Sequence, residues 1–109
     1  MIEALWTLKF GRVGPDEGAG VMVLETGRVF GGDSSFSFIG GYSVKDETLT
    51  AKVHVKRHAQ HLVNIFGIDE FDLVIKGAVS TPQMRLVGEI VGHPGATLHI
   101  QALRAAELP

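Results

Sequence analysis

The sequence contains no cysteine among its 109 residues. Disulfides, thiolate nucleophiles and cysteine-ligated metals are therefore excluded. Basic charge is not in excess either, because ten lysines and arginines stand against twelve aspartates and glutamates, for a net charge of −2. A domain that binds nucleic-acid phosphates needs a basic face. We therefore expect no direct nucleic-acid binding.

Long apolar runs are also missing. No run approaches the ~18 apolar residues of a membrane span, and the start of the chain, "MIEALWTLKF", lacks the basic and apolar regions of a signal peptide. We expect no membrane partner and a cytoplasmic location. The length is that of one domain, since domains typically have about 100–150 residues. The prediction is a single domain over residues 1–109.

Glycine is plentiful, with 14 residues, well above the usual share of about 7%. The densest stretch is "GGDSSFSFIGGY", residues 31–42. A phosphate-binding loop would lie between a strand and a helix, but no helical pattern and no P-loop lysine follow here. Aromatic residues alternate instead, at Phe36, Phe38 and Tyr42. We interpret the stretch as a turn with Asp33 as an Asx-type residue, followed by a strand that bends at its glycines.

Apolar and polar residues alternate along most of the chain, which is typical of half-buried strands. The clearest case is "TLTAKVHVKR", residues 48–57, and Thr26-Gly27 fits a hairpin turn. Only "HAQHLVNIFG" breaks the period, with apolar residues spaced as in a helix, which predicts a short helix over residues 59–66. Together these patterns predict an all-β fold, a small antiparallel up-and-down barrel of about eight strands with one short helix.

A longer pattern carries a family resemblance. The stretch "GVMVLETGRVFGGD", with the aromatic strand after it and "GIDEFDLVIKG" further on, resembles the GrlR-like negative regulators of type III secretion. The resemblance runs from about Trp6 to Leu108. It implies a lipocalin-like barrel with one helix, a homodimer, and a non-enzymatic function in which the protein binds a transcriptional activator.

The resemblance also implies a contact site for that protein partner. In the family, an exposed acidic motif in a loop of the barrel is implicated in holding the activator. The nearest match here is "VKDET", in which Asp46 and Glu47 are acidic and Lys45 opposes them. The expected partner-binding loop is therefore Lys45, Asp46 and Glu47.

The reactive side chains do not form a catalytic pattern. His54, His58 and His61 invite a metal interpretation, but they fall on different predicted elements, so we expect no metal. The chain has no Gly-x-Ser-x-Gly elbow, and Ser35, Ser37 and Ser43 are interpreted as the polar face of a strand. The adjacent acidic pairs, Asp16-Glu17, Asp46-Glu47 and Asp69-Glu70, are interpreted as solvated loop charges. We expect no enzyme and no cofactor.

The alternative function is that of a carrier for a small apolar ligand in the barrel lumen. Eight-stranded barrels have interiors that side chains just fill or that hold one small ligand. Small residues on the inward parity, among them Gly40, Ala51 and Gly88, either make room for a ligand or let the strands bend, and bending is the favoured interpretation. The expected lining consists of Trp6, Phe36, Phe38, Tyr42, Val53, Leu73, Leu86 and Ile100.

Overall fold

The computed structural model describes residues 2–60 and 66–109, and its described part is built from strands and their connections. The eight strands follow the predicted alternating segments. They are β1 (Ala4–Gly11), β2 (Gly18–Glu25), β3 (Arg28–Gly32), β4 (Phe36–Lys45), β5 (Thr48–Arg57), β6 (Glu70–Ala78), β7 (Gln83–Ile90) and β8 (Thr97–Ala106).

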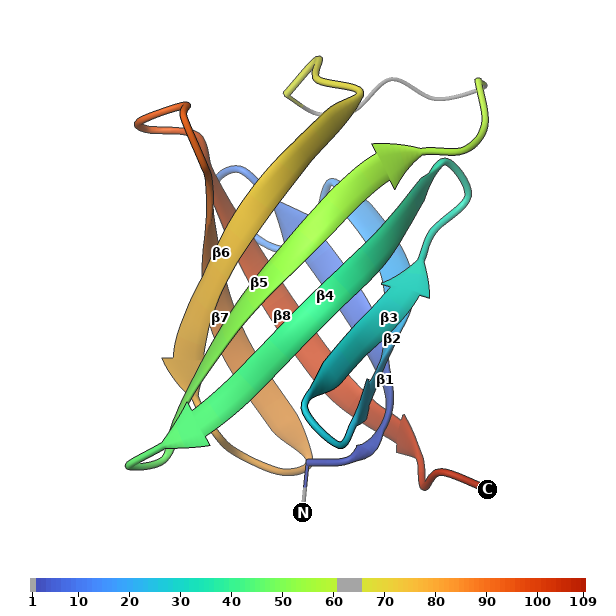
Figure 1. Ribbon diagram of the computed structural model, residues 1–109, viewed down its shortest axis with the longest axis vertical. Helices are drawn as coiled ribbons and strands as arrows, with labels where there is room; N and C mark the ends of the chain where they lie inside the picture. Colours follow the sequence, from blue (N-terminus) through green and yellow to red (C-terminus); the bar gives the residue numbers. More distant parts are fainter. Residues whose placement is uncertain (1, 61–65) are drawn as a thin grey trace.

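The strands form one closed barrel in which each strand pairs antiparallel with the next along the chain. Closure comes from the pairing of β1 with β8, where Leu8 lies opposite Ala102 (Figure 1). The prediction of an all-β, antiparallel, up-and-down barrel of about eight strands is confirmed. No helix occurs in residues 2–60 and 66–109. The expected helix over 59–66 lies mostly on residues 61–65, outside the described residues, and its described ends, Ala59, Gln60 and Phe66, are not helical.

The period of two becomes the inside and outside of the barrel. In β5, Leu49, Ala51, Val53 and Val55 are buried, whereas Lys52, His54 and Lys56 are exposed between them. Successive side chains of a strand point to opposite faces, so one strand supplies both the core and the surface.

No helix of the described residues has the length and apolar character needed to cross a membrane.

Two glycines are required by the curvature of the small barrel. A Cβ on Gly40 would lie 1.9 Å from the carbonyl oxygen of Lys52, and one on Gly31 would lie 2.1 Å from that of Val21. Neighbouring backbone therefore fills the space that a side chain would need at either position. The glycine-rich stretch is sheet, as the alternation of its aromatic residues predicts, and its glycines allow close backbone approach.

The two ends of the barrel differ in their connections (Figure 1). At the short-turn end, β2 joins β3 through Thr26-Gly27 and β4 joins β5 through Asp46-Glu47, and both chain termini lie there. The opposite, long-loop end carries the connections at 12–17, 33–35 and 91–96, together with residues 58–60 and 66–69 between β5 and β6. The interior of the barrel also differs between the two ends, because in the described part of the chain only the long-loop end contains a cavity.

Candidate ligand cavity

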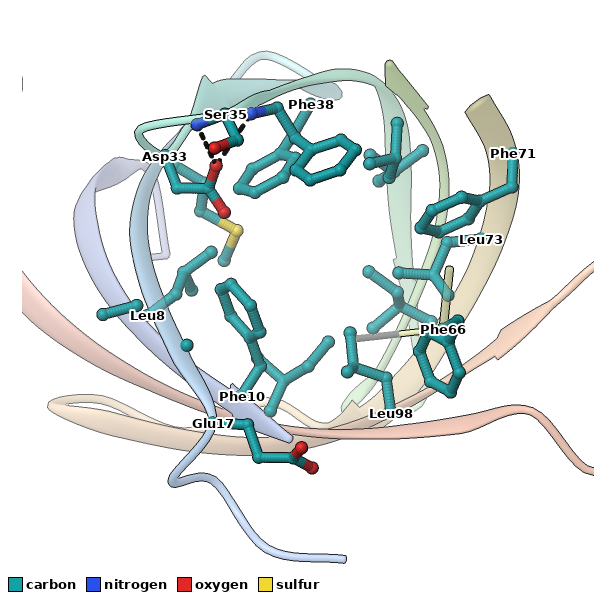
Figure 2. Close-up of a pocket in the computed structure, with 18 of the residues that line it drawn as sticks. Leu8, Phe10, Glu17, Asp33, Ser35, Phe38, Phe66, Phe71, Leu73 and Leu98 are labelled. Atoms are coloured by element: carbon teal, nitrogen blue, oxygen red, sulfur yellow. Dashed lines mark hydrogen bonds between the residues drawn. The ribbon is translucent and has the colours of Figure 1, made fainter. Parts of the chain in front are cut away.

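A cavity of about 210 Å³ opens at the long-loop end of the barrel (Figure 2). Its walls come from the end of β1, the start of β2, the β3–β4 connection and the facing ends of β5, β6 and β8. The lining residues are Leu8, Phe10, Glu17, Gly18, Ala19, Met22, Val29, Asp33, Ser34, Ser35, Phe36, Phe38, Val53, Val55, Phe66, Phe71, Leu73, Ile75, Leu98 and Ile100.

The short-turn end of the interior is filled instead. Trp6 is completely buried there, and its indole Nε1 donates a hydrogen bond to the carbonyl of Ile2 at 2.9 Å. Leu24, Leu49 and Met84 are also almost fully buried and do not belong to the described lining of the cavity. The barrel thus has a packed half and a hollow half, and the boundary runs across its middle.

Phenylalanine dominates the wall of the cavity. Of the six phenylalanines in the chain, five line it: Phe10, Phe36, Phe38, Phe66 and Phe71. The rings of Phe10 and Phe38 meet edge to face, with centroids 6.5 Å apart and planes at 82°, a favoured arrangement for aromatic pairs. The sixth, Phe30, lies on the outer face of β3 and is partly exposed. The wall is therefore apolar and largely aromatic.

The polar part of the wall is the β3–β4 connection. The Asp33 carboxylate oxygen Oδ1 accepts hydrogen bonds from the backbone N–H of Ser35 at 2.9 Å and of Phe36 at 2.8 Å. This is the Asx-type turn that the sequence predicts at Asp33. Figure 2 shows that the second carboxylate oxygen of Asp33 faces the interior of the cavity. The turn thus presents one oxygen of Asp33 to its own backbone and the other to the lumen.

Ser35 is a buried hydroxyl in this turn. It is only 2% exposed, and its Oγ has no hydrogen-bond partner among the described residues. The interpretation of Ser35 as part of an outward polar face is wrong, because β4 begins at Phe36 and the alternation does not extend back into the turn. Less than 1 Å² of this oxygen is accessible, so it is buried in the turn and does not face the open space of the cavity.

The end of β5 holds this turn in place. The backbone N–H of His58 donates to the carbonyl of Ser35 at 2.8 Å, and the His58 ring nitrogen Nε2 lies 3.0 Å from the carbonyl oxygen of Asp33. The guanidinium of Arg57 stacks over the ring of Phe36 at 4.8 Å and bonds to the Asp69 carboxylate at 2.8 Å. These contacts join the β3–β4 connection, which forms the polar part of the wall, to the end of β5.

Glu17, at the rim of the cavity, is already paired. Its carboxylate accepts hydrogen bonds from the Arg12 side chain, the shortest at 2.7 Å, and from the Arg12 backbone N–H at 2.6 Å. The side-chain and backbone hydrogen bonds from Arg12 lower the pKa of Glu17. The charge of this carboxylate is therefore compensated locally.

The expected lumen residues are divided between the two halves. Phe36, Phe38, Val53, Leu73 and Ile100 line the cavity. Trp6 and Leu86 are buried in the core, and Tyr42 is partly buried against it, but these three are not among the described lining residues. The sequence interpretation did not include Phe10, Phe66 and Phe71, nor Ser35 and Asp33. Aromatic content was the one signal that could have pointed to the first three.

The histidines do not converge. The ring of His54, on the outer face, bridges two carboxylates, with Nδ1 2.8 Å from Asp72 and Nε2 2.6 Å from Glu70. The hydrogen bond to Asp72, and to a smaller extent the one to Glu70, raise the pKa of His54. His58 contacts the cavity turn, and His61 lies outside the described residues. Within the described ranges, no group of three acidic or histidine side chains is arranged to hold a metal.

The expected partner-binding loop lies at the short-turn end, away from the cavity. Lys45 ends β4, and Asp46 and Glu47 form the two-residue turn to β5 with all three side chains exposed. Both turn residues have positive φ, 51° for Asp46 and 62° for Glu47. Such turns strongly prefer Asn-Gly or Asp-Gly, so Glu47 in particular holds an unfavourable backbone conformation.

Neither the models of known protein families nor the curated proteins contain a match to this chain.

Proposed function

We propose that the protein is a non-enzymatic barrel of lipocalin-like type that binds a small, largely apolar ligand in the cavity at its long-loop end. The observation that carries this proposal is an open cavity whose wall is apolar and largely aromatic and which the Asp33 carboxylate faces (Figure 2). Ligand sites are typically apolar cavities with a few placed polar groups.

The volume limits the size of the ligand. At about 210 Å³, the cavity is larger than the ~150 Å³ engineered cavity that admits benzene and smaller than the pockets of about 300–1,000 Å³ that hold drug-sized molecules. A molecule with one aromatic ring and a short substituent fits between these limits.

The test is titration with 2-phenylethanol, followed by calorimetry and by ligand-observed NMR. We expect saturable, one-to-one binding to the wild type. Val55→Phe adds an aromatic ring to the cavity wall and should abolish binding. The matched control is Val87→Phe, which places the same ring on the exposed outer face of β7 and should leave binding unchanged. Equal binding by the two variants, or none to the wild type, would contradict the proposal.

A second proposed function is protein binding through the turn Lys45–Glu47, as a cytoplasmic homodimer that regulates type III secretion by holding a transcriptional activator. The resemblance to the GrlR-like regulators supports it, and so does the backbone of the turn. Residues kept in unfavourable conformations cluster at functional sites, and Asp46 and Glu47 both have positive φ. The Asp46 and Glu47 side chains would then bind a partner, although they do not favour the backbone conformation of the hairpin turn.

Capture of a partner from the native host tests this second function. Replacing Asp46 and Glu47 by lysine should remove capture, because it reverses the charge of the turn. The control is Glu25→Lys. Glu25 is a partly exposed carboxylate that pairs with Arg28 at the neighbouring β2–β3 turn. If the charge-reversed turn captures the same partner as the wild type, the assignment of this turn is wrong.

A further inference from the structure

The charge of the cavity wall has one sign. Among the twenty described lining residues, Glu17 and Asp33 are acidic and none is lysine, arginine or histidine. The charge of Glu17 is compensated by Arg12, whose guanidinium donates two hydrogen bonds to the Glu17 carboxylate, from Nε and from Nη2. Asp33 is therefore the carboxylate that a ligand in the cavity meets.

Asp33 is held with one oxygen free for a ligand. Oδ1 is used by the backbone N–H groups of Ser35 and Phe36, whereas Oδ2 has no hydrogen bond to a described residue and faces the lumen in Figure 2. The turn fixes the side chain, so the acceptor is pre-positioned and loses little conformational entropy when a ligand binds. An ionised carboxylate only accepts hydrogen bonds, so its partner must be a donor.

Ser35, in the same turn, offers no second acceptor to a ligand. Its Oγ has less than 1 Å² of accessible area and does not face the open space of the cavity. A ligand in the cavity therefore meets Asp33 Oδ2 and not this hydroxyl.

The aromatic wall adds a second preference. Five phenylalanine rings surround the lumen, and the faces of aromatic rings attract cations. A carboxylate and a set of phenyl rings together favour a positively charged donor attached to an apolar body. An anionic ligand such as a carboxylic acid would meet Asp33 with no compensating cation from the described wall.

We propose that the ligand of the cavity is a small primary amine, with its ammonium group on Asp33 Oδ2 and its aromatic or aliphatic body among the phenylalanines. This inference rests on the proposed ligand-binding function and specifies the chemical class. The ammonium group has three donors, one for Asp33 Oδ2 and the others for water at the rim.

Three probes of matched size test the inference: 2-phenylethylamine, 2-phenylethanol and phenylacetate, each titrated by calorimetry at low ionic strength. We expect the amine to bind about tenfold or more tightly than the alcohol, as hydrogen bonds to charged groups require, and phenylacetate to bind most weakly. Added salt should weaken binding of the amine but not of the alcohol.

The variant that isolates the charge is Asp33→Asn. It keeps an Oδ1 acceptor for the turn and removes the carboxylate, so the amine should fall to the affinity of the alcohol, while the alcohol changes less than about threefold. Asp46→Asn is the matched control, since it removes an exposed carboxylate at the opposite end of the barrel, and it should leave the ratio of amine to alcohol unchanged.

The outcomes separate the two proposals. If none of the three probes binds the wild type, the proposed ligand-binding function fails. If they bind but the amine has no advantage over the alcohol, or if Asp33→Asn leaves that advantage intact, only the assignment to amines is overturned. The comparison among probes on the wild type remains decisive even if Asp33→Asn does not fold.

Discussion

The same substitution should have different effects in the two halves of the barrel, because only one half is hollow. Leu73 lines the cavity and is 4% exposed, and Gly88 beside it contributes no side chain, since a Cβ there would lie 3.1 Å from the Leu73 side chain. Leu24, 1% exposed, is not among the described lining residues and lies opposite Ala4, which is fully buried. Both are buried leucines on strands, so Leu73→Phe and Leu24→Phe form a matched pair.

The expected sizes follow from packing. Extra carbon atoms forced into a filled interior cost about 1–3 kcal/mol, which is the loss expected in the free energy of unfolding for Leu24→Phe. At Leu73 the added ring enters existing space, and each buried methylene-sized group there contributes about 0.8 kcal/mol, which offsets strain. The net change for Leu73→Phe should therefore stay within about 1 kcal/mol of zero.

Urea unfolding followed by the fluorescence of Trp6 measures both variants. Trp6 is the only tryptophan and is fully buried in the folded state, so its emission reports global unfolding. In thermal unfolding, Leu24→Phe should lower the Tm by at least about 4 °C, since 1 kcal/mol corresponds to about 4–8 °C in a domain of this size. Equal losses at both positions would refute the division of the interior into a filled and a hollow half.

Two further predictions concern the surface. Replacing Asp46-Glu47 by Asn-Gly should raise the free energy of unfolding by about 1 kcal/mol or more, because the left-handed conformation costs an ordinary residue about 1–2 kcal/mol; thermal unfolding measures this, and no gain would mean that the native side chains compensate for the strain. The pKa of His54 is raised by its hydrogen bonds to Asp72 and, to a smaller extent, to Glu70. Its stabilising contribution is therefore fully present below about pH 6.5 and is lost as the pH rises through the folded-state pKa. The stability difference between wild type and His54→Gln, measured by urea unfolding, should therefore shrink above pH 6.5, and a difference that stays constant with pH would contradict this.

The barrel itself was predictable because alternation is a local signal with a global consequence. In β5 each apolar residue of "TLTAKVHVKR" is inside and each lysine is outside, and the same pattern recurs in strand after strand. Tight turns such as Thr26-Gly27 indicate that neighbouring strands pair antiparallel. Given about eight such strands, closure leaves no unpaired edge, and the structure closes β1 on β8.

The cavity was only partly predictable, because its position depends on side chains that lie far apart in the sequence. Parity places Phe36 and Phe38 inside, but it cannot tell which half of the lumen Trp6 fills. Ser35 was misassigned because parity was extended through a turn, where the backbone no longer alternates. Phe66 precedes β6 in a long connection, so no strand periodicity places its ring on the cavity wall.

The two proposed functions use opposite ends of the barrel, which makes their independence testable. The cavity opens among the long loops, whereas Asp46 and Glu47 lie at the short-turn end (Figure 1). A ligand that binds only the folded protein stabilises it, by about 2.7 kcal/mol at a hundredfold excess over its Kd. Such stabilisation does not alter a distant surface unless the ligand favours one of two conformations of that surface. We therefore expect saturating 2-phenylethanol to raise the Tm while leaving the affinity for a captured protein partner unchanged, and a partner affinity that shifts with ligand would show that the two ends are coupled through the barrel.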